Sequence, residues 1–429
     1  MSFLKRLFAR GSRRSVRPVI TLAQPRLARH LCVSEAYTPT QPRTTRSMLT
    51  GRQHEIDTIV QGLTEDRAHV VLYSERGRGK TSLANVIVEA LRRSGLIVVR
   101  TQCESASTFD SVMRGLLGDL PATFLKLPPA EGESVGCTSA LPRAAVRPDD
   151  VVAVLPKLRA RTLICVVDEF DRVSDTGSRT MFADMIKQAS DRGLPLMFMI
   201  IGVSDSLEQL LGQHPSIQRN ILPVPLPLMA DEAIVALVET GAQAAELSFP
   251  PALVARVAAI SRGMPYVAHL LGRRIAQATA QRGTRAIEER DFAQAVDRLI
   301  LETPPSVIQQ YDELTDGGTD AAMVSALDAV ARCRQDVWGR ILLGPQGDGG
   351  VLLGGARLDG RCWSRLRDAC VLRPCAGKPG HVTYGERALI QYALLRASTP
   401  TDAGRAATER VLPPTERTAV MTGSDLYSP

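Results

Sequence analysis

The chain has 429 residues, of which 44% are hydrophobic, 23% charged and 4% aromatic. This composition is typical of a globular protein, and at about 100–200 residues per domain the length predicts two to four domains with mainly aliphatic cores. The longest apolar runs, Leu163–Val167 and Leu196–Ile201, are far shorter than the ~20 residues of a membrane-spanning helix, which excludes a transmembrane function.

The net charge of +7 is distributed unevenly along the chain. Residues 1–52 contain eleven lysines and arginines against one acid, Glu35, so the remaining chain is mildly acidic. The basic charge therefore indicates a basic segment and not a basic folded surface. We expect residues 1–48 to form a basic disordered tail; the alternatives are a mitochondrial transit peptide and a contact with anionic membranes or phosphates.

The eight cysteines contain no Cys-x-x-Cys pair, which favours free thiols in a reducing compartment. We expect a cytoplasmic protein of bacterial type. The mitochondrial matrix is the alternative if the basic N-terminus is a transit peptide.

Beyond Leu49 the sequence alternates between short apolar runs and amphipathic stretches. Short apolar runs rich in β-branched residues predict buried strands, whereas apolar residues three and four positions apart predict helices. Their alternation predicts a parallel sheet covered by helices on both faces, an α/β fold with a three-layer α/β/α core. The predicted strands are His69–Tyr73, Leu96–Val99, Leu163–Val167, Leu196–Ile201 and Ile221–Pro225, and the predicted helices are Thr81–Leu91, Phe109–Leu117 and Met181–Ala189.

Beyond Pro227 helical periodicity replaces the strand pattern, and a third region, about Thr319–Ala397, combines helices with a Gly-rich segment and a possible hairpin around Lys378–Thr383. The later helices are predicted at Asp231–Gln243, Pro251–Ser261, Pro265–Arg282 and Glu289–Glu302. The predicted division is a tail over residues 1–48, a core over 49–228, a helical domain over 229–302, a third domain over 303–398 and a disordered tail over 399–429.

The predicted strand at His69–Tyr73 continues into a loop that ends in Gly-Lys-Thr and begins a predicted helix, as in the P-loop motif G-x-x-x-x-G-K-[ST]. Backbone amides of such a loop bind phosphate oxygens, the lysine bridges the β- and γ-phosphates, and the Thr hydroxyl binds Mg²⁺. Gly77 and Gly79 allow positive φ, whereas Ser74 replaces the first glycine of the motif. The predicted nucleotide-binding residues are Ser74, Glu75, Arg76, Gly77, Arg78, Gly79, Lys80, Thr81 and Ser82.

A second motif follows about ninety residues later, where the apolar run Leu163–Val167 ends in Asp168 and Glu169. A buried parallel strand presents such residues at the sheet edge where ligands bind. Asp168 can hold Mg²⁺ through water, and Glu169 can act as general base for the attacking water. Both motifs together predict hydrolysis. The chain has no Asn/Thr-Lys-x-Asp segment of the kind that recognises guanine, so ATP is the expected nucleotide.

Over about Leu49–Arg298 the chain resembles the AAA+ ATPases, specifically the origin-recognition-like group and its STAND relatives. Besides the two motifs above, the resemblance depends on the segments Leu49–Glu55 and Ile201–Asp205. It implies that Gly51 and Arg52 lie near the adenine and that Ser204 is the polar "sensor 1" after the fourth strand.

The resemblance also implies an arginine that reaches into a neighbouring subunit's nucleotide, and Arg219 matches its position. A homo-oligomer would then form through Arg219. In the helical domain Pro265 matches a Gly-x-Pro-like helix start, but Tyr266 stands where the family has a "sensor 2" arginine. This departure predicts slow turnover and a STAND-type switch.

The third region resembles a winged-helix domain, with Trp363–Cys370 as the recognition-like helix and Lys378–Thr383 as the wing. The leading expectation is an ATP-hydrolysing, Mg²⁺-dependent switch that couples nucleotide state to a partner or an assembly, the protein partner being unknown. One alternative is a DNA-binding initiator or regulator that contacts double-stranded DNA with this region. Another is a scaffold that binds ATP without hydrolysing it. The phosphate contacts to DNA would come from Arg361, Arg365, Arg367, Arg373 and Lys378.

Overall fold

The computed structural model describes residues 33, 36–38, 51–120, 124, 126, 137–158, 162–212, 215–347, 350–375 and 378–399. They belong to two compact units, each described below by itself. Unit 1 is assigned residues 1–19 and 42–226, and unit 2 is assigned residues 20–41 and 227–429. Within the described residues, no helix combines the length and the apolar character that crossing a bilayer requires.

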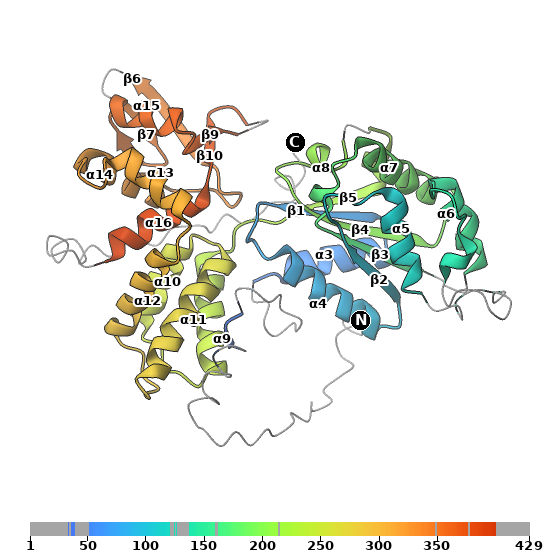
Figure 1. The fold of residues 1–429 in the computed structure, drawn as a ribbon, viewed down its shortest axis with the longest axis horizontal. Helices are drawn as coiled ribbons and strands as arrows, with labels where there is room; N and C mark the ends of the chain where they lie inside the picture. Colours follow the sequence, from blue (N-terminus) through green and yellow to red (C-terminus); the bar gives the residue numbers. More distant parts are fainter. Residues whose placement is uncertain are drawn as a thin grey trace. The chain divides into compact units, whose positions relative to one another are not determined.

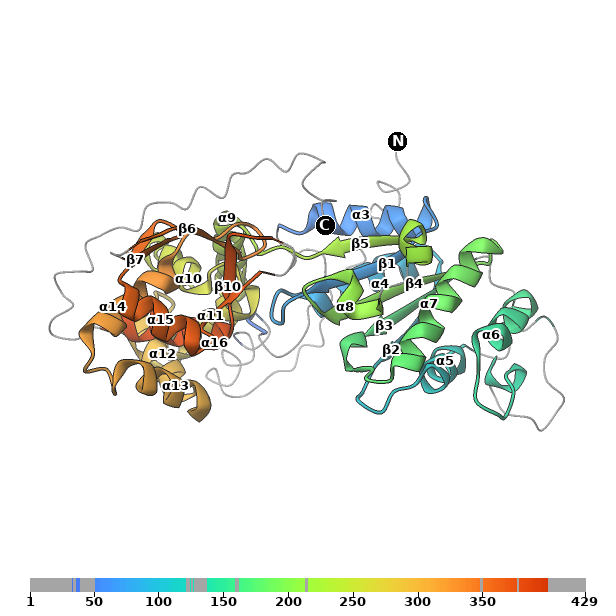
Figure 2. The same ribbon diagram turned by 90° about the horizontal axis from the view of Figure 1, so that it is seen from above.

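The described part of unit 1 forms a five-stranded sheet in the order β2-β3-β4-β1-β5 (Figure 2). All four strand pairings are parallel, as the alternation of strands and helices predicts. The strand that carries the loop, β1, and the strand that carries the acids, β3, are separated by β4. The strands are β1 (His69–Ser74), β2 (Ile97–Gln102), β3 (Leu163–Asp168), β4 (Leu196–Val203) and β5 (Ile221–Pro225).

Helices cover both faces of this sheet (Figure 1), because successive strand residues point to opposite sides. Val70, Leu72 and Val166 pack with α3 and α4, whereas Val71 and Val167 pack with α5, α6 and α7. The fold is therefore the expected three-layer α/β/α core. The helices of unit 1 are α3 (Gln53–Thr64), α4 (Lys80–Arg93), α5 (Phe109–Gly118), α6 (Pro148–Val154), α7 (Thr176–Asp191) and α8 (Leu207–Leu211), with short 3₁₀ turns at Cys137–Ala140, Leu155–Lys157, Phe170–Arg172 and Pro215–Asn220.

Unit 2 begins with four helices that end within two residues of their predicted bounds. A second, antiparallel sheet follows in the order β8-β7-β6-β10-β9. Three of its strands occupy the region where the sequence indicated only a Gly-rich segment. The elements are α9 (Asp231–Ala244), α10 (Pro251–Ser261), α11 (Pro265–Gln281), α12 (Glu289–Leu301), α13 (Pro305–Thr315), α14 (Ala321–Arg332), β6 (Ile341–Gly347), β7 (Gly350–Leu353), β8 (Ala356–Leu358), α15 (Gly360–Asp368), β9 (Leu372–Pro374), β10 (His381–Tyr384) and α16 (Arg387–Ser398).

One hydrophobic cluster joins the described helices α9–α16 of unit 2 to its antiparallel sheet. It contains Leu237 and Phe292 of the first four helices together with Ile341 and Leu353 of the sheet and Leu394 of α16. The helical domain and the third domain expected from the sequence thus share one core. Helix α15 followed by the β9–β10 hairpin has the order expected of a recognition helix and a wing, and the winged-helix assignment stays a prediction.

Part of the expected N-terminal tail is buried in unit 2. Val33, Ala36 and Tyr37 are excluded from solvent and pack with Ala276, and the Tyr37 hydroxyl donates to the Val238 carbonyl at 2.7 Å. At these positions the prediction of a solvated tail is wrong, because an aromatic ring gains more from burial than a polar segment does. The rest of 1–48, and 400–429 of the C-terminal tail, lie outside the described residues.

Candidate functional site

The loop between β1 and α4 has the backbone conformation that its sequence predicts. Gly77 and Gly79 adopt φ of 83° and 93°, in the left-handed region that favours glycine. Gly79 is also the N-cap of α4 and supplies no capping side chain. The first turn of α4, with Thr81 and Ser82, therefore presents backbone amides and the positive end of the helix dipole to an anion.

Lys80 is the first residue of α4, and its ammonium lies among oxygens of the loop. Its Nζ donates to the carbonyls of Ser74 and Glu75, both at 2.8 Å, and to Ser74 Oγ at 3.2 Å. Only 9% of the residue is exposed. Burial lowers the pKa of Lys80 to about 8, against the opposing charge of Asp171. The lysine thus has polar partners that phosphate oxygens could replace.

Ser74 fits the position where the motif has its first glycine. It is buried, and it is absent from the described residues with positive φ, so the turn imposes no left-handed strain on a side chain. Its hydroxyl donates to the Glu75 carbonyl at 3.0 Å and accepts from Lys80. The serine is therefore built into the loop as a second oxygen partner of the lysine.

The predicted Gly51-Arg52 segment lies against this loop. Gly51 has φ of 74°, and Arg52 is buried, with Nη1 2.8 Å from Glu55 and Nη2 3.4 Å from the Arg78 carbonyl. Burial lowers the pKa of Arg52, and the Glu55 charge opposes this shift. The contact with Arg78 joins the segment that precedes α3 to the loop.

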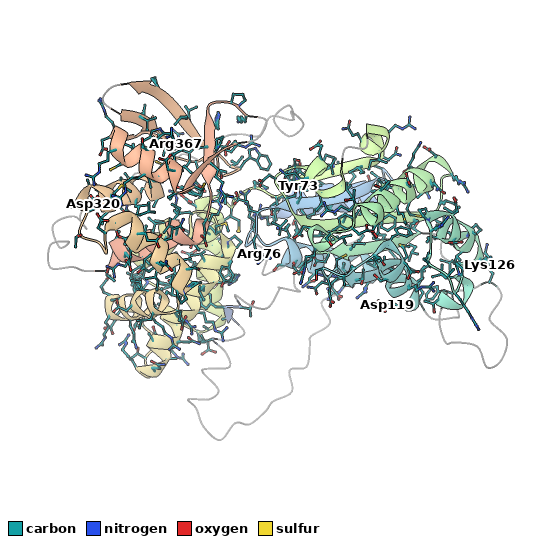
Figure 3. The ribbon with its side chains drawn as sticks, turned by 45° about the horizontal axis from the view of Figure 1, so that its top comes forward. Tyr73, Arg76, Asp119, Lys126, Asp320 and Arg367 are labelled. Carbon is teal, nitrogen blue, oxygen red and sulfur yellow. The ribbon has the colours of Figure 1, made fainter. Side chains whose placement is uncertain are left out.

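The side chain of Arg78 holds the loop to the end of the sheet. It donates to the Leu226 carbonyl at 3.0 Å and pairs with Glu75 at 3.1 Å. Only the backbone of Arg78 is thus left to face a phosphate. Arg76 is exposed in the same loop, and it lies with Tyr73 at one end of unit 1 (Figure 3).

The two acids after β3 have different surroundings. Asp168 is 4% exposed; its Oδ2 accepts from Arg100 at 2.5 Å and its Oδ1 from the backbone N–H of Glu169 at 2.9 Å. The Glu169 side chain is 40% exposed and accepts from Arg172 at 2.8 Å. The hydrogen bond from Arg172 lowers the pKa of Glu169, and one from Gln102 adds to it. Glu169 is therefore a solvent-accessible, ionised carboxylate.

Ser204 follows β4, the strand between the loop strand and the acid strand. Its backbone N–H donates to the Ser74 carbonyl at 3.4 Å, while its hydroxyl donates to the Ser206 carbonyl at 2.7 Å. Asp171 accepts from the Val203 N–H at 2.8 Å and is the acid that most raises the pKa of Lys80. The sheet order thus brings Ser74, Ser204 and Asp168 to one edge. No sequence signal marked Asp171.

The two remaining predicted residues are Arg219 of unit 1 and Pro265 of unit 2. Arg219 is the penultimate residue of the 3₁₀ turn Pro215–Asn220, which precedes β5; its side chain is 76% exposed and lies 3.4 Å from Asp191. Pro265 is the first residue of α11 in unit 2, after the N-cap Met264. A contact of Pro265 or Tyr266 with the nucleotide stays a prediction.

The oxygens at this edge fit a magnesium ion that arrives with phosphates. Mg²⁺ prefers oxygen ligands and is usually held by one or two carboxylates, waters and substrate phosphates. Asp168 and the Thr81 hydroxyl would supply the protein oxygens. Among the described residues, no group of three or more His, Cys, Asp or Glu could hold a metal ion by itself.

Residues 48–200 match the family model of the AAA ATPase domain. None of the curated proteins compared with the chain matches it.

Several solved structures resemble the chain. A Walker-type ATPase of Pyrococcus abyssi is 14% identical over 83% of this chain and 99% of its own, with a TM-score of 0.45. Cdc6p of Pyrobaculum aerophilum is 15% identical over 86% and 99%, also at 0.45. The RuvB Holliday junction branch migration motor of Thermotoga maritima is 15% identical over 83% and 98%, at 0.42. The matched segment 48–200 contains the loop, both acids, the whole of β1, β2 and β3, and the larger part of β4. The match identifies residues 48–200 as an AAA ATPase domain.

Proposed function

We propose that unit 1 binds ATP with Mg²⁺ and hydrolyses it to ADP and phosphate. One observation carries the proposal: a loop with two glycines of positive φ and a buried lysine begins α4 at the sheet edge that also holds the buried Asp168. Backbone amides, an ammonium and a helix N-terminus together favour a triphosphate. Adenine is the proposed base because the chain lacks the segment that recognises guanine.

Each residue of the site has a proposed part. Lys80 exchanges its bonds to the loop carbonyls for bonds to phosphate oxygens, while Thr81 and Asp168 hold Mg²⁺, which neutralises the phosphate charge when bound. Glu169 accepts a proton from the attacking water. Arg172 and Gln102 hydrogen-bond Glu169, so the carboxylate must give up these partners before it can accept a proton from the water. This requirement supports the slow turnover expected from the sequence. Ser204 contacts the phosphate region, and Gly51 and Arg52 contact the adenine side.

The test is a matched pair of substitutions measured for nucleotide binding and for phosphate release. Lys80→Ala removes the ammonium and should abolish ATP binding, whereas Lys187→Ala, at an exposed position of α7, should leave it unchanged. Glu169→Gln should keep ATP binding and lower phosphate release by about 10²-fold or more. Glu89→Gln, at a position of α4 whose side chain is 46% exposed, is its control.

The outcomes separate hydrolysis from binding alone. Phosphate release that is unchanged in Glu169→Gln would contradict the assigned base, and ATP binding without release in the unaltered protein would leave the scaffold function. A protein that retains no adenine nucleotide in excess Mg²⁺ would contradict the proposal as a whole.

A switch that acts through unit 2 is the proposed consequence of hydrolysis, and DNA is the alternative partner. Contacts of α15 weaken the DNA alternative, because Arg361 and Arg365 each lie 3.1 Å from Asp320, which offsets charge that would face phosphates. Arg367 pairs with its neighbour Asp368 at 3.1 Å and lies apart from Asp320 in Figure 3. If DNA binds here, Arg367→Ala should reduce the slope of log affinity against log salt concentration by about 1, which corresponds to the loss of one phosphate contact.

A further inference from the structure

Arg100 links the acid strand to helix α4. It lies on β2, and its Nη2 donates to Asp168 Oδ2 at 2.5 Å while its Nη1 donates to Asn85 Oδ1 on α4. Its side chain is 27% exposed and that of Asp168 6%. The guanidinium therefore joins a carboxylate and an amide from two different elements in a mainly buried position.

The positions of these residues follow from the geometry of their elements. Arg100 pairs with Val166 across β2 and β3, two residues before Asp168, so both side chains lie on one face of the sheet. This is the face that α4 covers, since Val98 and Val166 pack with α4. Asn85 lies four residues after Thr81 on α4, and residues four apart share one face of a helix. Asp168 is thus bound to Arg100, and Thr81 lies one helical turn before Asn85. Both proposed magnesium ligands are therefore beside the contacts that Arg100 makes with Asp168 and Asn85.

Hydrogen bonds fix the Asp168 carboxylate at both of its oxygens. Arg100 binds Oδ2, and the backbone N–H of Glu169 binds Oδ1. An ionised carboxylate has about four lone-pair sites, so these two bonds leave acceptor capacity for a metal ion or for its bound water. Asn85 in turn restrains the Arg100 side chain, which could otherwise adopt several rotamers.

We propose that Arg100, held by Asn85, is a positioning residue for magnesium at this site. This inference rests on the proposed ATP site and adds to it a residue that neither motif includes. Partners of ligating carboxylates typically contribute 10–100-fold to metal affinity because they fix the orientation of the ligand. Removing the guanidinium frees Asp168 to rotate, so the site should need more Mg²⁺.

The experiment measures binding of a fluorescent, non-hydrolysable ATP analogue to the full chain while Mg²⁺ is titrated. In Arg100→Gln the Mg²⁺ concentration at half-maximal binding should rise by about 10–100-fold, while the affinity without Mg²⁺ should be unchanged. Arg100→Lys, which can contact only one of the two partners, should restore part of the effect. Asn85→Ala should give a smaller rise, because Arg100 remains but is no longer held.

Arg92→Gln is the matched control. Arg92 also connects α4 to β2, through hydrogen bonds to the Val98 carbonyl at 2.9 and 3.3 Å, and its partner in these bonds is a carbonyl and not a carboxylate. Its loss should affect thermal stability and not the Mg²⁺ midpoint. If Arg100→Gln unfolds, Asn85→Ala alone decides the outcome.

Two results would overturn the inference. If Arg100→Gln and Asn85→Ala both have a Mg²⁺ midpoint within twofold of that of the unaltered protein, the role of Arg100 is purely structural. If the midpoint falls, Arg100 competes with the metal ion for Asp168. Absence of any nucleotide binding by the unaltered protein would instead contradict the proposed function, so the two failures are distinguishable.

Discussion

The ammonium of Lys80 is buried among carbonyl oxygens of its own loop, and this burial makes the site sensitive to alkaline pH. Because its pKa is lowered to about 8 from an ordinary value of 10.5, the lysine is charged at neutral pH and loses its proton as the pH rises through 8. In the proposed function a triphosphate binds the charged form, so binding above pH 8 would take up a proton.

This gives a prediction for ATP affinity between pH 7 and 9.5. The affinity should be nearly constant near pH 7 and should fall by up to tenfold per pH unit above 8, which is the slope of one linked proton. Calorimetry in two buffers of different ionisation enthalpy would measure the proton uptake directly. Lys187→Ala should keep the same profile. An affinity that stays constant to pH 9.5 would contradict the role of the ammonium.

At the residue scale, local sequence predicted the loop and the acids because their partners are neighbours in the chain. Gly77, Gly79 and Lys80 act within one turn, and Asp168 directly follows an apolar run. Arg100 and Arg172 could not be predicted as partners of the acids, because nothing in the sequence distinguishes an arginine that binds a carboxylate from one that is exposed to solvent. Only the pairing of β2 with β3 brings Arg100 within hydrogen-bond distance of Asp168.

At the element scale, α9 and α11 enclose the ring of Tyr37 because both have a glycine there. A Cβ on Gly241 or on Gly272 would lie 2.4 Å from Tyr37 Cε1, a distance that real atoms do not reach. His269 of α11 meets the ring edge-on, with centroids 6.3 Å apart. The two helices thus form a socket for one aromatic side chain of the N-terminal segment.

We expect Gly272→Ala to destabilise unit 2 by ~1–3 kcal/mol through overpacking, measured by urea unfolding, and to speed hydrogen exchange at the Tyr37 amide. Gly115→Ala on α5 is the control, since its nearest neighbour would lie at an ordinary 3.6 Å. In a Tyr37→Ala background Gly272→Ala should cost little. An equal cost in both backgrounds would mean that the ring is not what the new methyl group meets.

The elements of the parallel sheet were predictable because each strand contains a short apolar run. The strand Ile221–Pro225 has its predicted bounds, and the strand from Leu163 extends one residue further, to Asp168. The strands β6 to β8 were not predictable, because their glycines hide the alternation that identifies a strand. Tyr37 was missed for a related reason: a single aromatic residue in a polar segment has no periodicity, and its burial depends on helices two hundred residues away.

At the scale of the whole molecule, Arg219 decides whether copies of the chain complete one another's site. Its side chain is largely exposed and has a long 3.4 Å contact with Asp191, so its loss should hardly affect the stability of the monomer. If it reaches the nucleotide of a neighbouring copy, Arg219→Ala should lower phosphate release by on the order of 10³-fold while ATP binding persists.

Asp191→Asn is the matched variant, because it breaks the same ion pair and keeps the arginine. Mass in solution should be measured without nucleotide, with ADP and with a slowly hydrolysed ATP analogue. Nucleotide-dependent assembly in Asp191→Asn and in the unaltered protein is the expected result. A monomer under all three conditions, with full activity in Arg219→Ala, would contradict the role in a neighbouring site.

The continuous hydrophobic cluster of unit 2 has a mechanical consequence. Since Leu237 and Phe292 share their packing with Ile341, Leu353 and Leu394, the four helices and the antiparallel sheet cannot slide past each other without opening close-packed side chains. Any tilt imposed on α9 or α11 must therefore carry β6–β10 through the same angle, with a displacement that grows with distance from the pivot.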